Sequence, residues 1–349
     1  MEELLRAAVI KKASDLHITV GVPPIVRIHG ELTPLDYPKL LPPDTEQLLQ
    51  QITTQSQLQR IKEKGDLDFS FAIQGLARFR VNAFHQRGSI AIVARLVAEK
   101  IPTLEQLKHP EILKQLCKKT RGLILVTGPT GSGKSTTLAS MVNEINHSRS
   151  CHIITLEDPI EYLHRHNRSI VNQREIFSDT QSFSMALRAA LREDPDVILV
   201  GEMRDIETIS TAITAAETGH LVFATLHTSD APQTVDRIID AFPSHQQQQI
   251  RTQLSMTLQG VISQQLLTKA DSSGRVAALE IMISTPAIRN LIREGKTHQI
   301  ASSIQTGSKA GMQSMDMSLR DLYRSGFISY DDALTHAIDP DTLTRLLMS

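Results

Sequence analysis

The sequence predicts an α/β protein with two domains, a small α+β domain followed by a larger domain built on a parallel sheet. From Leu123 onward, continuous apolar runs alternate with segments of helical spacing, as in a parallel sheet covered on both faces. Before that point the apolar runs are short and are separated by turn residues, which is typical of antiparallel strands. A chain of 349 residues is long enough to fill two cores.

The first domain is expected to span residues 1–97, with a mostly antiparallel sheet and two or three helices. Helical spacing covers 1–14 and 45–64. The expected strands are 17–20 and 25–29, on either side of a turn with Gly21, Pro23 and Pro24, and a hairpin of 77–84 with 90–96.

Residues 98–104 are interpreted as a linker because the character of the chain changes there, and 105–349 as the second domain. Its expected strands are 123–127, 152–156, 197–200 and 221–226. Beyond Gln246 the pattern predicts helices, with one further strand at 276–283.

Composition narrows the class of protein. The formal net charge is -1 and aromatic residues make up 4%, which disfavours a general nucleic-acid or membrane-surface binder. The two cysteines, Cys117 and Cys151, lie far apart without a C-x-x-C pattern, so a zinc ribbon is excluded and a reducing, cytoplasmic setting is expected. Neither a membrane span nor a secretory signal is predicted.

The stretch G-P-T-G-S-G-K-S-T at 128–136 matches the phosphate-binding pattern G-x-x-x-x-G-K-[ST]. It follows a predicted strand and opens a predicted helix, as the motif requires. Glycines let the backbone N–H groups face phosphates, Lys134 is placed to reach the β- and γ-phosphates, and the Ser135 hydroxyl to bind Mg²⁺. The predicted ATP-binding residues are Gly128, Pro129, Thr130, Gly131, Ser132, Gly133, Lys134, Ser135 and Thr136.

Acidic residues follow two other predicted strands. Glu202 comes after 197–200, and Glu157 begins the cluster E-D-P-I-E after 152–156. Carboxyl ends of parallel strands share one edge of the sheet, so both acids are expected near the γ-phosphate. For Glu202 three roles are open: a base for the attacking water, a ligand of the metal or its water shell, or an ordinary turn acid. The role of base is favoured for Glu202. Glu157 is expected to act on the Mg²⁺ water shell or on the attacking water. The alternative is that the acidic cluster that Glu157 begins is only solvated.

Further charged groups are candidates for the same chemistry. His227 follows the strand 221–226 and is placed to sense the γ-phosphate or a neighbouring subunit, unless it is an ordinary surface histidine. Phosphoryl transfer also needs cations. Arg80 and Arg95 lie on the two segments of the predicted hairpin, where they either line a solvated sheet face or are donated to a nucleotide.

Four motifs in order resemble the secretion and type IV pilus (GspE/PilT-like) ATPase superfamily: G-P-T-G-S-G-K-S-T, T-L-E-D-P-I-E-Y, V-G-E-M-R-D and G-H-L-V-F-A-T-L-H-T. The stretches A-S-D-L-H-I, A-I-R-N-L-I-R-E-G and G-M-Q-S-M-D-M-S-L are similar to the type IV pilus retraction ATPase (PilT) family. The resemblance implies a PAS-like N-terminal domain and a RecA-like P-loop ATPase domain. It also implies that Glu202 is the catalytic glutamate and that Arg80 and Arg95 complete an ATP site between the domains.

The function implied by the resemblance is a homohexameric, ATP-hydrolysing motor that powers pilus retraction and twitching motility. It would act at the cytoplasmic face of the inner membrane on a platform protein of the pilus machinery, reaching the membrane only through partners. The alternatives are an ATPase for pilus assembly or type II secretion, a non-hydrolysing adaptor, and a nucleic-acid translocase. Assembly and secretion ATPases typically carry a longer N-terminal region and a four-cysteine metal module, both missing here.

Overall fold

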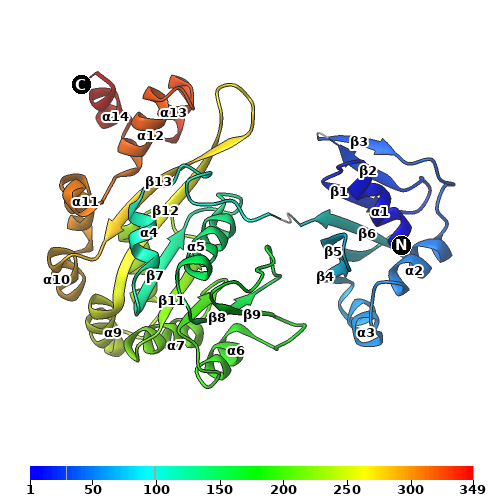
Figure 1. Ribbon diagram of the computed structural model, residues 1–349, viewed down its shortest axis with the longest axis horizontal. Coiled ribbons are helices and arrows are strands. Elements are labelled where there is room, and N and C mark those ends of the chain that lie inside the picture. Colours follow the sequence, from blue (N-terminus) through cyan, green and yellow to red (C-terminus); the bar gives the residue numbers. More distant parts are fainter. Residues whose placement is uncertain (29, 98–99, 349) are drawn as a thin grey trace. The chain divides into compact units, whose positions relative to one another are not determined.

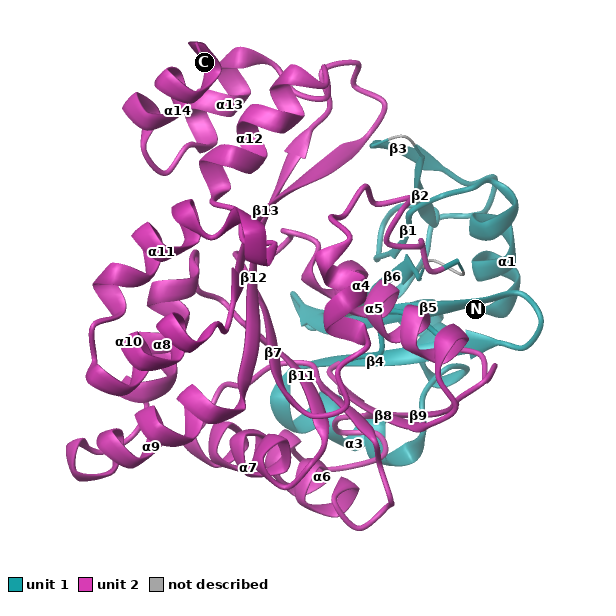
Figure 2. Cartoon of the chain, turned by 60° about the vertical axis from the view of Figure 1, so that its left-hand side comes forward, with its two compact units in different colours: residues 1–100, 159–163 teal, residues 101–158, 164–349 magenta. Residues whose placement is uncertain are grey.

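The computed structural model describes residues 1–28, 30–97 and 100–348, which form two compact units by their internal contacts (Figures 1 and 2). Unit 1 comprises Met1–Lys100 and Pro159–Leu163, and unit 2 comprises Ile101–Asp158 and His164–Ser349. Residue 29 of the predicted strand 25–29 and residues 98 and 99 of the predicted linker lie outside the described residues. The linker boundary therefore stays a prediction.

Unit 1 is a six-stranded antiparallel sheet with the strand order β3-β2-β1-β6-β5-β4. The sheet packs on its helices through a core of alternate strand residues such as Val81, Ala83 and Ile92. The expected antiparallel α+β domain is thus confirmed. Its elements are α1 (Glu2–Ile10), β1 (Asp15–Ile18), β2 (Ile25–Ile28), β3 (Glu31–Pro34), α2 (Pro42–Gln50), α3 (Gln55–Lys64), β4 (Asp66–Ile73), β5 (Ala77–Gln86) and β6 (Ser89–Leu96).

The helical spacing over 45–64 is divided between two helices, α2 and α3, so unit 1 has three helices among its described residues, within the two or three expected. Thr54 begins α3 with a reciprocal cap: its side chain accepts from the backbone N–H of Gln57, and the Gln57 side chain accepts from the backbone N–H of Thr54. Such a cap starts a new helix and so interrupts the earlier one. Strands β3 and β4 were not predicted.

Unit 2 contains a seven-stranded sheet with the order β13-β12-β7-β11-β10-β8-β9. The four strands predicted from apolar runs are present and run parallel to one another. They are β7 (Gly122–Thr127), β8 (His152–Glu157), β10 (Val197–Val200) and β11 (Leu221–Leu226). A further parallel strand, β9 (Ile170–Glu175), extends the sheet beyond β8 and was not predicted.

The prediction of helix between Gln246 and the strand at 276–283 is wrong for one segment. Residues after α9 (Ser244–Thr257) form β12 (Leu258–Thr268), which pairs in parallel with β7 and antiparallel with β13 (Arg275–Ile283). This long strand lies on the other side of β7 from β11. Its place next to the strand that leads into the phosphate loop matters for the site.

Helices cover both faces of the unit 2 sheet (Figure 1). Leu123 and Leu125 of β7 belong to one core, whereas Ile124 and Val126 belong to the other. One face carries α4 (Ile112–Cys117) and α5 (Lys134–Ser148). The other carries α6 (Phe183–Ala190), α7 (Ile206–Glu217), α8 (Ala231–Asp240), α9, α10 (Pro286–Glu294) and α11 (Ile300–Thr306).

The remaining helices of unit 2 pack on the ends of β12 and β13. They are α12 (Met315–Arg324), α13 (Tyr330–His336) and α14 (Pro340–Met348), and two short 3₁₀ turns precede them, η1 (Thr297–Gln299) and η2 (Ser308–Ala310). Among the described residues, none of these or the other helices has the length and apolarity needed to cross a membrane.

Candidate nucleotide site

The predicted phosphate loop lies between the buried strand β7 and the N-terminus of α5. Three of its glycines have positive φ angles, +139° at Gly128, +82° at Gly131 and +89° at Gly133. Side chains rarely tolerate this backbone, and a Cβ atom on Gly128 would also lie 2.3 Å from the backbone oxygen of Gln264 on β12. The glycines therefore let the loop fold tightly against β12 and open toward the start of the helix.

Lys134, the first residue of α5, is held inside this loop. Its Nζ atom donates to the backbone oxygens of Gly128 and Pro129 at 2.8 and 3.0 Å. Partial burial lowers its pKa, and the nearby negative charge of Glu202 acts in the opposite direction. Ser135 beside it is exposed, so its hydroxyl can reach a ligand at the helix N-terminus.

Glu202 is held at the same sheet edge by the strands on either side of β10. The backbone N–H of Gly201 donates to Leu156 of β8 at 2.8 Å, and that of Met203 donates to Thr225 of β11 at 3.1 Å. A Cβ atom on Gly201 would lie 3.0 Å from the Leu156 oxygen. The glycine that separates the strand from the glutamate thus permits this close approach to β8.

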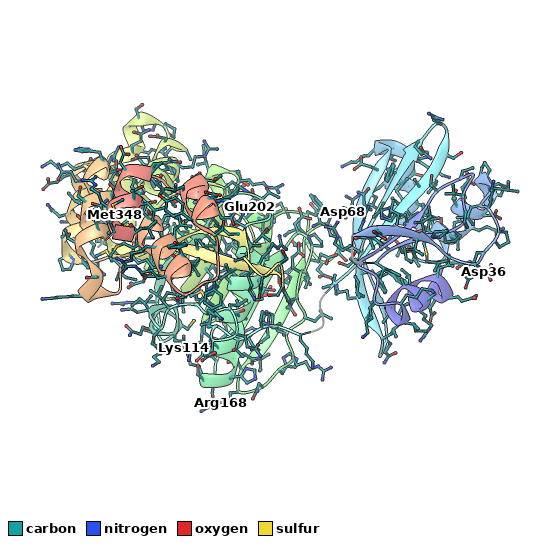
Figure 3. All side chains as sticks on the ribbon, turned by 90° about the horizontal axis from the view of Figure 1, so that it is seen from above. Asp36, Asp68, Lys114, Arg168, Glu202 and Met348 are labelled. Carbon is teal, nitrogen blue, oxygen red and sulfur yellow. The ribbon has the colours of Figure 1, made fainter. Side chains whose placement is uncertain are left out.

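The Glu202 carboxylate (Figure 3) contacts two basic side chains. Arg204 Nη2 lies 2.8 Å from Oε2, and His227 Nε2 lies 3.2 Å from Oε1. The Glu202 side chain is 20% exposed and lines a cavity of about 870 Å³. The structure therefore brings the predicted residues Glu202 and His227 together and adds Arg204, for which no role was predicted.

These contacts set the charge of Glu202. Partial burial alone would raise its pKa, but the hydrogen bond and charge of Arg204, assisted by His227, outweigh burial and hold the pKa below the ordinary value. The group is therefore a carboxylate at neutral pH. Its negative charge also acts on Lys134, so the carboxylate and the loop lysine lie close enough to interact.

Glu157 ends β8, the neighbour of β10. Its Oε1 atom accepts hydrogen bonds from Thr155 at 2.6 Å and from Gln173 at 3.1 Å. The next residue, Asp158, adds to the charge that raises the pKa of Arg204. Glu157 and Asp158 thus lie on the Glu202 side of the sheet edge, whereas Glu161 belongs to unit 1.

Arg80 and Arg95 lie directly opposite each other on β5 and β6 of unit 1. Arg80 pairs with Asp68 (Figure 3) at 2.7 Å and with Glu161 at 3.4 Å. Arg95 pairs with the buried carboxylate of Asp15 at 2.8 Å. These carboxylates offset the repulsion that two cations in facing positions would otherwise experience.

His220, at the other end of β11, has a local role. Its Nδ1 atom lies 3.0 Å from the backbone oxygen of Ala215 near the end of α7. The same carbonyl also accepts from the backbone N–H of His220 and from the Thr218 hydroxyl, each at 3.1 Å, so the ring adds one more contact at the end of the helix. His220 is thus part of a helix end and lies away from the phosphate loop.

A glycine loop between a buried strand and a helix, with a carboxylate at the end of the parallel strand next but one in the sheet, defines a P-loop ATPase with a RecA-like domain. The chain belongs to the Type II/IV secretion system protein family, whose model matches residues 1–317. It is 51% identical over 339 residues to the Type IV pilus retractation ATPase PilT of Pseudomonas aeruginosa, covering 97% of this chain and 98% of that protein.

Two further comparisons agree with this placement. A twitching motility protein of Neisseria gonorrhoeae is 47% identical over 341 residues, covering 98% of this chain and 91% of that protein. The crystal structure of the pilus retraction motor PilT and bound ADP superimposes with a TM-score of 0.92, at 52% identity and 98% coverage of both chains. The two-domain fold expected from the sequence is thereby confirmed.

Proposed function

We propose that this chain is an ATP-hydrolysing motor, active as a homohexamer, that powers retraction of type IV pili and so supports twitching motility. Its similarity to the retraction ATPases carries the proposal, because it extends over almost the full length of both proteins. The chain would work at the cytoplasmic face of the inner membrane, reaching the membrane through the pilus platform protein.

In the proposed reaction Glu202 is the general base. A water molecule attacks the γ-phosphorus of ATP, the bond from that phosphorus to the β-phosphate oxygen breaks, and the water proton passes to the Glu202 carboxylate. Two observations support this role: the carboxylate is ionised, and Arg204 and His227 fix both of its oxygens. His227 would orient the base and respond to the γ-phosphate on the same side.

Positive charge for the transferred phosphoryl group would come from Lys134, Arg80 and Arg95. Lys134 exchanges two backbone oxygens for phosphate oxygens when ATP enters. For the arginines, binding ATP likewise means exchanging carboxylate partners from the same chain for phosphate. Backbone N–H groups of the loop would hold the remaining phosphate oxygens.

The residues at the sheet edge suit an Mg²⁺ ion that is coordinated mainly by phosphate and water, and not a metal that is coordinated mainly by protein side chains. Ser135 presents an exposed hydroxyl, and Glu157 presents a carboxylate at the end of β8. Within the described residues, no cluster of three or more His, Cys, Asp or Glu could hold a metal. Bound Mg²⁺ would neutralise phosphate charge, with Ser135 as a direct ligand and Glu157 acting on its water shell.

The proposal is tested by deleting the gene and restoring it with wild-type, Lys134→Ala or Glu202→Gln copies. If the chain powers retraction, cells that lack the gene should carry excess pili and should not twitch, and only the wild-type copy should restore twitching. If these cells instead had no pili, the chain would be an assembly ATPase. A purified wild-type hexamer that does not release phosphate from ATP would contradict the enzymatic part.

A further inference from the structure

A buried glutamine of β12 joins the phosphate loop to α5. The Gln264 side chain is on a residue that is 2% exposed. Its Nε2 atom donates to the backbone oxygen of Ser132 at 2.6 Å, and its Oε1 atom accepts from Thr137 Oγ1 at 2.7 Å. One amide group thus connects a loop residue to the first turns of the helix that the loop opens.

The direction of each hydrogen bond follows from the chemistry of the partners. The Ser132 carbonyl can only accept, so the NH₂ group of Gln264 must face it and the amide oxygen must face Thr137. Thr137 therefore donates its hydroxyl proton to Gln264. It accepts from His109 Nε2, which lies 3.0 Å away.

His109 completes the chain of hydrogen bonds. Burial lowers the pKa of its ring to about 4, so the ring is neutral at pH 7. The neutral ring carries its proton on Nε2, because Thr137 has no second proton to give. A directional chain thus runs from His109 through Thr137 and Gln264 to Ser132, and each of its members has one protonation state and one orientation.

The packing around Gln264 leaves little room for adjustment. A Cβ atom on Gly133 would lie 2.7 Å from Nε2 of Gln264, closer than nonbonded atoms approach. On the strand itself, the Gln264 backbone oxygen lies under Gly128, where a Cβ would be only 2.3 Å away. Gln264 therefore leaves no room for a Cβ atom on either Gly128 or Gly133, the first and the sixth residue of the loop motif.

We propose that Gln264 is a positioning residue for ATP, which holds the loop backbone between Ser132 and α5 in the conformation that binds phosphate. A loop anchored in advance loses less conformational freedom when the nucleotide arrives, so its anchor contributes to affinity. The inference rests on ATP being the ligand, which is part of the proposed function, and is independent of pilus retraction.

The test compares Gln264→Leu with Gln313→Leu in the full-length protein. Both glutamines donate their amide to a backbone oxygen, but Gln313 bonds Leu279 of β13 instead of the loop. Binding is measured with a fluorescent N-methylanthraniloyl ATP, and folding with thermal melting. Gln264→Leu is expected to weaken ATP binding about tenfold or more, since it leaves Ser132 and Thr137 without their buried partner. Gln313→Leu is expected to lower the melting temperature without changing ATP affinity.

Two other variants keep the inference testable if leucine at this position prevents folding. Gln264→Glu keeps the size and the bond from Thr137, but its carboxylate cannot donate to Ser132, so ATP binding should still weaken. Thr137→Val removes the other bond, and combining it with Gln264→Leu should add little because both act through one chain.

Unchanged ATP affinity in folded Gln264→Leu and Gln264→Glu proteins would overturn the inference. Equal loss of affinity in Gln313→Leu would also overturn it, because the effect would then follow from general destabilisation. If the wild-type protein itself bound no ATP, the proposed function would be contradicted, and the inference with it. If the protein bound ATP normally but its deletion did not change the pili, only pilus retraction would be contradicted and the role of Gln264 would stand.

Discussion

Replacing Glu202 with glutamine tests the base assignment most directly. The two side chains have the same shape, so an amide can occupy the space of the carboxylate between Arg204 and His227. The amide oxygen can accept from Arg204, and the amide NH₂ can donate to a neutral His227 ring. Packing and position are therefore retained, and the change is confined to loss of the negative charge and of the proton acceptor.

Because only the charge and the proton acceptor are lost, the expected fall in kcat can be estimated. General base catalysis contributes about 10²–10⁴-fold, so kcat should fall by roughly 10³-fold, equivalent to about 4 kcal/mol in the activation barrier. Affinity for ATP should stay the same or increase. The reason is that the carboxylate lies close enough to Lys134 to influence it electrostatically, and so also repels the incoming phosphates.

Phosphate release at saturating ATP gives kcat, and titration with a fluorescent ATP gives affinity. A matched control is Glu193→Gln, whose carboxylate pairs with Arg174 of β9 at 2.8 Å and has no part in the proposed reaction. The control should retain near-normal turnover. If Glu202→Gln hydrolysed ATP within about threefold of the wild-type rate, the assignment of Glu202 as the base would be refuted.

Three other substitutions give separate predictions. Arg204→Ala removes the main cation that lowers the Glu202 pKa, so the carboxylate should stay protonated up to a higher pH. In a kcat–pH profile, the fall in activity on the acidic side should therefore begin at a higher pH than in the wild type. An unmoved acidic limb would contradict this. Gly133→Ala combines a φ of +89° with a steric clash, so equilibrium binding should show ATP affinity reduced at least tenfold; wild-type affinity would refute the packing argument. Arg95→Ala leaves the buried carboxylate of Asp15 with weaker partners and should destabilise unit 1 by about 1–3 kcal/mol in denaturant melts. Adding Asp15→Asn should restore part of that loss, and no restoration would show that the charge is not the cause.

The buried parallel strands, and the sheet edge at which they end, could be predicted from the sequence. A run such as Val197–Val200 is apolar at every position and mostly β-branched, and a short run of this kind is typical of a strand buried on both faces. Parallel strands also end at one edge, so the proximity of Glu202 to the phosphate loop followed from topology. The alternating pattern of Asp66–Ile73 had the same kind of signal, with buried Leu67, Phe69 and Ile73, and could have been recognised.

Other features left no local signal. Strand β12 starts at Leu258, immediately after the last residue of α9, so no turn residue marks the change from helix to strand. Because that segment was predicted as helix, Gln264 could not be placed beside the loop. The partner of Glu202 left no signal either. Arg204 follows Glu202 by two residues, and the path of the backbone between them depends on the hydrogen bonds of Gly201 to β8 and of Met203 to β11.

The cations that the proposed mechanism needs share one property, which is that each has a partner from its own chain. Lys134 contacts the loop backbone, Arg80 contacts Asp68, and Arg95 contacts Asp15. Binding ATP must therefore exchange these contacts for phosphate oxygens, and only the surplus of the new interactions over the old ones contributes to affinity or rate. Removing one internal partner should favour the exchange. In the Asp68→Asn variant, Arg80 is accordingly expected to bind phosphate more readily. The KM for ATP should then be lower in this variant than in the wild type.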